Sequence, residues 1–123
     1  MRRFEITRPL LGETITALVL ELEEGVHVSV FGGQRAHIGA VSIASPDGGC
    51  TTTQFPEHRD GVVSERWAKA LSEAGYRPAV VEAGIHYDGL SRDGIAETVA
   101  LTEAMLDEML AVLRGNKKLR RNQ

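Results

Sequence analysis

The segment Thr14-Ile-Thr-Ala-Leu-Val-Leu-Glu-Leu22, followed by Glu23-Glu-Gly25 and then Val26-His-Val-Ser-Val-Phe31, predicts the centre of the fold. β-Branched and aliphatic residues fill both longer runs, and the acidic, glycine-containing break between them is typical of a tight turn. Two paired strands are therefore expected. Because side chains alternate between the faces of a strand, the three valines of the second run share one face and His27 lies on the other.

Two further runs predict a second pair of strands. Ile38-Gly-Ala-Val-Ser-Ile-Ala44 leads into an Asp-Gly step at residues 47–48, which is a strong hairpin signal, and Thr51-Thr-Thr-Gln-Phe55 returns as its partner. An additional strand is expected near residues 4–7, where Pro9 interrupts the pattern.

The spacing of apolar residues changes from two to about 3.6 near residue 60, which predicts a helix over residues 60–74 that ends at Gly75. The apolar run 78–83 follows as a short strand, and Ser91 is placed to cap a final helix. One apolar stripe of that final helix comprises Ile95, Val99, Thr102, Leu106, Met109 and Leu113, and a second comprises Leu101, Met105 and Val112. This wide apolar surface favours a homodimer over a monomer, although it could instead face the sheet and the first helix.

The order of strands, helix, strand and helix predicts an α+β fold. We expect a single domain over residues 1–113, with a mostly antiparallel sheet of five to six strands and two helices packed on one face. Residues 114–123 hold five of the fourteen basic residues and lack apolar periodicity, so they are expected to form a disordered basic tail.

Composition and charge exclude several functional classes. Residues 1–113 carry nine basic and seventeen acidic side chains, a net charge of −8, which is unsuited to binding nucleic acid. No apolar run is long enough to cross a bilayer, so no membrane association is expected. A cytoplasmic location is expected, because the first residues lack the apolar region of a secretory signal and the single cysteine, Cys50, cannot form an internal disulfide.

Three histidines lie in short polar segments that each follow a strand-like run. The segments are Gly32-Gly-Gln-Arg-Ala-His-Ile-Gly39, Phe55-Pro-Glu-His-Arg-Asp60 and Gly84-Ile-His-Tyr-Asp-Gly89. If the strands ending at residues 31 and 55 are the first and third of a meander, their following segments share one end of the sheet. The helix 60–74 then crosses over to a parallel strand, which places the third segment at the same end.

These segments suit a small anionic ligand such as a phosphate-bearing molecule. The helix starts near Asp60 and Ser91 present unpaired backbone N–H groups, although each residue could simply cap its helix. Glycines permit close approach of a ligand to the backbone, and arginines add positive charge. The candidate ligand-binding residues are Gly32, Gly33, Arg35, His37, Gly39, Phe55, His58, Arg59, Asp60, His86 and Asp88.

Other roles are open for the same residues. The glycine pair at residues 32–33 could serve only a hairpin turn. A metal-dependent enzyme that uses His37, His58 and His86 as ligands is the main alternative function, since three histidines can hold zinc and leave a position open for water. The chain contains no His-Glu-x-x-His, Cys-x-x-Cys, Gly-x-Ser-x-Gly or Walker motif, so we assign no metal ligand and no catalytic residue.

Three motifs occur in order along the chain: His37-Ile-Gly-Ala-Val41, Pro56-Glu-His-Arg-Asp60 and Ala83-Gly-Ile-His-Tyr-Asp88. Over about residues 25–110 the sequence thereby resembles the LpdD-like proteins. These are described as prenylated flavin chaperones and occur as accessory D subunits of UbiD-type decarboxylases such as gallate decarboxylase. The basic C-terminal residues are not part of the resemblance.

The resemblance implies a non-catalytic accessory protein that binds FMN or prenylated FMN and delivers it to, or helps mature, a UbiD-type decarboxylase. A flavin prenyltransferase is a second candidate partner. Phe55 stands where the family has an apolar residue, and it could pack against an isoalloxazine-like ring. The positions that match the family motifs are His37, Gly39, His58, Arg59, Asp60, His86 and Asp88.

Overall fold

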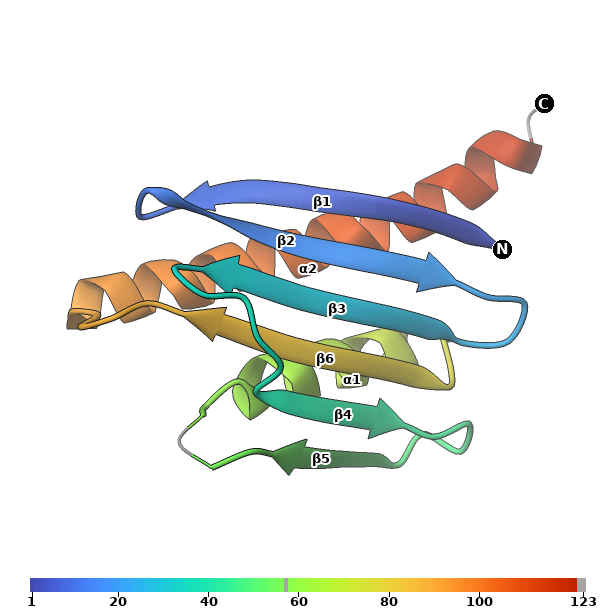
Figure 1. The fold of residues 1–123 in the computed structure, drawn as a ribbon. Coiled ribbons are helices and arrows are strands. Elements are labelled where there is room, and N and C mark those ends of the chain that lie inside the picture. Colours follow the sequence, from blue (N-terminus) through green and yellow to red (C-terminus); the bar gives the residue numbers. More distant parts are fainter. Residues whose placement is uncertain (57, 122–123) are drawn as a thin grey trace.

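The computed structural model describes residues 1–56 and 58–121, and from residue 116 onward it describes the backbone alone. Within this part of the chain, six strands and two helices follow one another (Figure 1). Their bounds are β1 (Arg2–Leu10), β2 (Glu13–Glu21), β3 (Val26–Gly33), β4 (Ala40–Ala44), β5 (Cys50–Gln54), α1 (Gly61–Glu73), β6 (Ala79–His86) and α2 (Arg92–Arg121).

The strands form one mixed sheet in the order β1-β2-β3-β6-β4-β5. β6 pairs parallel to β3, and the other neighbouring strands pair antiparallel, which confirms the mostly antiparallel α+β fold. The predicted meander is wrong, because β6 lies between β3 and β4. The buried, apolar residues of β6 favour a central position, where the strand has a neighbour on each side.

The strand directions nevertheless bring the three histidine segments together. β3 and β6 run the same way, β4 runs against β6, and β5 runs against β4. The carboxyl ends of β3, β5 and β6 therefore share one end of the sheet, on the left in Figure 1. We call this the carboxyl end of the sheet.

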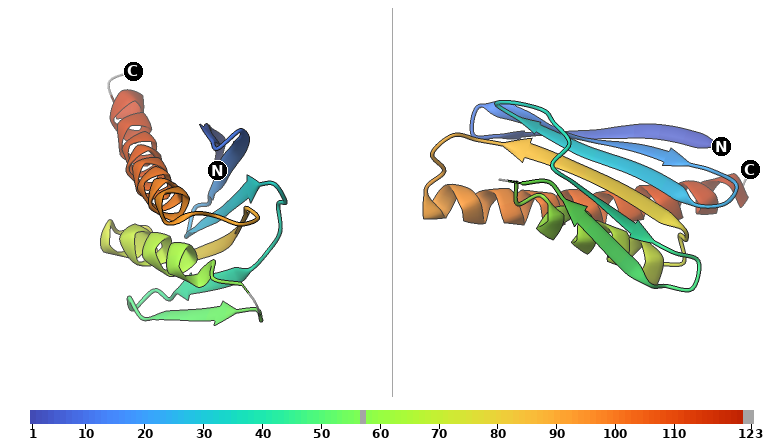
Figure 2. Two further views of the ribbon diagram at one scale, coloured as in Figure 1. Left: turned by 90° about the vertical axis from the view of Figure 1, so that its left-hand side faces the viewer. Right: turned by 60° about the horizontal axis from the view of Figure 1, so that its bottom comes forward.

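Both helices cover the same face of the sheet, as predicted (Figure 2). The valines of β3 point toward the helices and are buried, together with Trp67 and Leu71 of α1. His27 lies on the uncovered face, as the alternation predicted. That face also carries six partly exposed apolar side chains, Leu18, Leu20, Phe31, Val41, Ile43 and Val80.

Only part of the predicted apolar stripe of α2 is buried. Ile95 and Val99 are 53% and 54% exposed, because the start of α2 projects beyond the ends of the strands (Figure 1). The buried residues of α2 are Gly94, Thr102, Met105, Leu106, Met109 and Leu113. Most of this surface therefore packs within the chain, and the homodimer stays a prediction.

The ends of several elements differ from the predicted ones. β1 continues through Pro9, because β1 is an edge strand and proline there interrupts no ladder on its outer side. β6 runs on to His86, three residues beyond the predicted end. α2 extends to Arg121 and so overlaps the predicted tail; the side chains of residues 116–121 and all of residues 122–123 lie outside the described part. Among the described residues, no helix combines the length and apolar character needed to span a membrane.

Candidate functional site

Three histidines meet at the carboxyl end of the sheet. His37 lies in the connection from β3 to β4, and His58 lies between β5 and α1. His86 is the last residue of β6, so it belongs to a strand and not to a loop as its motif suggested. The ring centroids of His37 and His58 are 4.6 Å apart, and those of His37 and His86 are 6.3 Å apart. We call these three residues, together with Asp60, the histidine site.

Asp60 connects the parts of this site. It precedes the first residue of α1, but its side chain makes no capping hydrogen bond to that helix. One carboxylate oxygen, Oδ1, accepts a hydrogen bond from the backbone N–H of Ile85 at 3.0 Å. The other, Oδ2, lies 3.1 Å from Nε2 of His37. The mostly buried carboxylate thus joins the start of α1 to β6 and to the loop that carries His37.

One further ring nitrogen of His37 and one of His86 have polar neighbours that orient the rings. Nδ1 of His37 lies 3.3 Å from the backbone carbonyl oxygen of Arg35. Nε2 of His86 lies 2.8 Å from Oδ1 of the exposed Asp88. His37 is therefore held from both sides of its ring, and His86 is turned toward its own following turn.

Two glycines make room for the site. A Cβ atom on Gly39 would collide with Oδ2 of Asp60 and lie 3.1 Å from Nε2 of His37. A Cβ atom on Gly84 would collide with the carbonyl oxygen of His37, where the β3–β4 connection passes in front of β6 (Figure 1). Any other residue at either position would displace the loop or the carboxylate.

The other two candidate glycines are the last residues of β3 and do not form the hairpin turn considered above. A Cβ atom on Gly32 would collide with the carbonyl oxygen of Thr14, and one on Gly33 would collide with that of His86. Close packing between neighbouring strands therefore accounts for these two glycines. Their predicted part in binding a ligand stays a prediction.

Side chains of the protein already bind N–H groups at both helix starts. The backbone N–H of Gly61 donates to Oε1 of Gln54 at 3.0 Å, and that of Gly94 donates to Oγ of Ser91 at 3.0 Å. The cap predicted at Ser91 is confirmed. Because these groups are occupied, the helix starts offer an anion less than the sequence suggested, and the exposed guanidinium groups of Arg35 and Arg59 are its more accessible partners.

A hollow of about 340 Å³ adjoins the site on the side of α2. Three acidic residues, Asp88, Asp93 and Glu97, contribute to its lining, so its charge opposes an anionic ligand. Tyr87 also lines it, and its hydroxyl donates a hydrogen bond of 2.7 Å to the carbonyl oxygen of Leu10. Burial, with a contribution from Glu13, raises the pKa of Tyr87.

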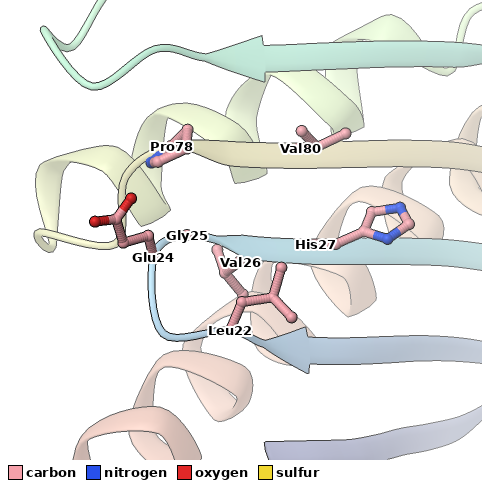
Figure 3. Close-up of a pocket in the computed structure, with 7 residues that line it drawn as sticks. All are labelled: Leu22, Glu24, Gly25, Val26, His27, Pro78 and Val80. Carbon is pink, nitrogen blue, oxygen red and sulfur yellow. The ribbon is translucent and has the colours of Figure 1, made fainter. Parts of the chain in front are cut away.

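A second hollow, of about 250 Å³, lies at the opposite end of the sheet (Figure 3). Its lining includes His27 and Glu24, and it is formed where β3 and β6 begin. His27 itself pairs with Glu82 across the uncovered face. The fourth histidine is therefore separate from the histidine site, as predicted.

Two glutamines near the site were not singled out by sequence reasoning. Gln54 binds the start of α1, and Oε1 of Gln34 accepts a hydrogen bond of 2.7 Å from the backbone N–H of Asp88. Each is a polar residue at or just after the end of a strand, and this position is the sequence feature that could have marked them as candidates. The partner of Gln34 is 54 residues away in the sequence, so that pairing had no local signature, whereas Gln54 binds a residue only 7 positions further on.

The chain is similar to a family model, to a curated protein and to solved structures. Residues 11–114 match the family model described as the prenylated flavin chaperone LpdD-like domain. Protein LpdD of Lactiplantibacillus plantarum is 24% identical over 110 residues, covering 85% of this chain and 81% of that protein. A solved structure, described as a novel chaperone complex for yeast 20S proteasome assembly, has a TM-score of 0.53 at 14% identity and covers 89% of this chain and 96% of its own. This last likeness concerns the fold alone.

The family match spans most of the chain and includes every residue of the histidine site. The three motifs that carried the resemblance lie within it, and the structure brings their histidines together. The chain belongs to the prenylated flavin chaperone LpdD-like family.

Proposed function

We propose that the protein binds prenylated FMN, or FMN, at the histidine site and delivers it to, or helps mature, a UbiD-type decarboxylase. The observation that carries the proposal is the meeting of three histidines from separate parts of the chain at one end of the sheet. Family membership supports a chaperone role. The flavin and the decarboxylase are inferences from the family description and from the chemistry of the site.

The residues present fit an anionic flavin. Arg35 and Arg59 are exposed cations in the same loops as His37 and His58, and they can hold a phosphate by charge-assisted hydrogen bonds. Imidazoles can donate to or accept from the polar edge of the flavin ring. Phe55, which is 44% exposed, offers an aromatic face for stacking. When bound, the flavin supplies the redox and covalent chemistry that the partner enzyme uses.

The acidic hollow predicts the orientation of the bound flavin. Its three carboxylates repel a phosphate, whereas the two arginines attract one, so the phosphate is expected on the side of Arg35 and Arg59. Arg35, Arg59 and Phe55 are all exposed. An open site suits a carrier, since the ligand has to leave it again for another protein.

Exposed apolar residues around the site offer a contact surface for the decarboxylase. Ile38 is 53% exposed and directly follows His37, and Val62 is 74% exposed and lies at the start of α1, just after Asp60. Exposed apolar groups beside a binding site are typical of surfaces that meet a partner protein. We therefore place the decarboxylase at this end of the sheet, where a flavin could pass directly between the two proteins.

The proposal is tested by co-expression with a flavin prenyltransferase, followed by an absorbance spectrum of the purified protein. Retained flavin absorbance, and its transfer to an apo UbiD-type decarboxylase on mixing, are the expected results. Replacement of Ile38 by lysine should slow the transfer while leaving the bound flavin in place. A protein that retains neither FMN nor its prenylated form would overturn the proposal.

A further inference from the structure

We infer that His37, His58 and Asp60 form a binding site for a divalent transition-metal ion. Each residue offers one ligand atom, and these three atoms lie within 4.8 Å of one another. The residues come from two connections that precede β4 and α1 and are far apart in the sequence. This site was not visible as a motif, because its spacing matches no common metal signature.

The distances suit a metal of this class. Metal bonds of about 2.0–2.1 Å place neighbouring tetrahedral ligand atoms about 3.3 Å apart and neighbouring octahedral ones about 3.0 Å apart. Nε2 of His37 and Oδ2 of Asp60 are already 3.1 Å apart. The ligand atom of the partly exposed His58 lies within 4.8 Å of both, so a side-chain movement on the order of 1.5 Å completes the set.

The groups behind the ligand atoms resemble the outer shell of a metal site. A ligating histidine ordinarily donates its second ring N–H to a carbonyl or carboxylate, and a ligating carboxylate is itself hydrogen-bonded. Nδ1 of His37 faces the carbonyl oxygen of Arg35 at 3.3 Å. Oδ1 of Asp60 accepts from the backbone N–H of Ile85 at 3.0 Å, which leaves Oδ2 to face His37.

Gly39 keeps the space beside both ligand atoms free. A side chain at this position would meet Oδ2 of Asp60 and Nε2 of His37, which are the two atoms that would hold the ion. The need for glycine therefore coincides with the proposed position of the metal.

The donor set selects the class of ion. Two imidazole nitrogens and one carboxylate oxygen suit zinc and neighbouring first-row divalent ions, whereas magnesium and calcium prefer oxygen alone. Three protein ligands leave at least one position open for water or for an anionic oxygen of a ligand. The sequence suggested His37, His58 and His86 as possible metal ligands. In the structure Asp60 replaces His86 in this set, because Nε2 of His86 is turned toward Asp88.

The metal site does not rest on the proposed function. Flavin binding is assigned to Arg35, Arg59 and Phe55 together with the histidines, and none of those first three residues is a metal ligand. A variant with both arginines replaced by alanine should lose affinity for FMN and keep its affinity for metal. The two proposals can therefore fail separately.

The test is a titration of the tag-free, chelator-treated protein with Co²⁺, whose visible absorption reports its ligands, followed by displacement with Zn²⁺. We expect one Co²⁺ per chain and its release by one equivalent of Zn²⁺. His37→Ala and His58→Ala should each weaken binding by at least about 100-fold, the upper range for loss of an outer-shell partner. Thermal melting of the metal-free variants shows whether each one still folds.

His27→Ala is the matched control, since His27 also pairs with a carboxylate but lies at the other end of the sheet. Its Co²⁺ affinity should equal that of the unmodified protein. The inference is overturned if the unmodified protein shows no Co²⁺ spectrum, or if a folded His58→Ala variant binds Co²⁺ as tightly as the His27→Ala control.

Discussion

Asp60 precedes the first turn of α1, where aspartate commonly caps a helix, and its sequence context supported that ordinary role. Its carboxylate instead binds the N–H of Ile85 and faces His37. Asp60 was a candidate binding residue from the sequence, and that role stays a prediction. Its partners depend on the position of β6, so local sequence could not identify what the carboxylate contacts.

The close packing around Gly39 predicts that a larger residue there destabilises the fold. Gly39→Ala should lower the free energy of unfolding by about 1–3 kcal/mol, because the added Cβ collides with the Asp60 carboxylate. Urea denaturation measures this change. Gly115→Ala is the matched control: an added Cβ there meets nothing within 4 Å, so alanine in α2 should raise the free energy of unfolding by about 0.5–1 kcal/mol. Equal effects of the two substitutions would contradict the packing described for Gly39.

Cys50 gives a second prediction, this time on reactivity. Partial burial, with a contribution from Glu65, raises the pKa of the Cys50 thiol. The folded chain then releases the thiol proton only at higher pH than the unfolded chain does, and only the thiolate reacts. Alkylation by iodoacetamide near pH 8.5, about the ordinary thiol pKa, should thus be slower in the native protein than in urea. Equal rates in the two states would argue against a protected thiol.

Among the elements, α2 shows where periodicity is informative and where it fails. The stripe predicted its buried residues from Thr102 to Leu113, but it also included Ile95 and Val99, which are exposed. Periodicity reports which side of a helix is apolar. It contains no information about where the sheet beneath the helix ends.

This difference can be measured by two matched truncations in α2. Leu106→Ala should lower the free energy of unfolding by about 2–5 kcal/mol, because the side chain is fully buried between the helix and the sheet. Val99→Ala should change it by no more than about 0.5 kcal/mol, since that side chain is already exposed. Thermal and urea unfolding of both variants measure these changes. A large effect of Val99→Ala would indicate that a partner covers the start of α2.

The strand order marks the limit of prediction from local sequence. Each strand was visible in the alternation or apolar content of its own residues, and the Asp-Gly step identified the hairpin between β4 and β5. The insertion of β6 between β3 and β4 depends on pairing of β6 with two strands that lie about 35 to 53 residues earlier in the sequence. Such pairing is a property of the whole sheet, and a single sequence contains no direct signal for it.

At the scale of the whole molecule, the histidine segments converge although the predicted meander is wrong. Strand direction alone sets the end of the sheet at which each segment emerges, and the directions of β3, β5 and β6 were correctly predicted. The neighbours of each strand were not needed for that conclusion. The details of the site, such as the contact between His37 and Asp60, required the true strand order.

The central claim is that the histidine site binds a flavin, and a titration of FMN fluorescence with purified protein tests it most directly. The unmodified protein and the His27→Ala control should quench FMN to the same extent and with the same affinity, because His27 lies at the opposite end of the sheet. Arg59→Ala should weaken binding by about 10-fold, as expected for loss of one charge-assisted hydrogen bond of about 1.5 kcal/mol. Failure of the unmodified protein to bind either FMN or prenylated FMN, or equal affinities for the Arg59→Ala variant and the control, would contradict the account.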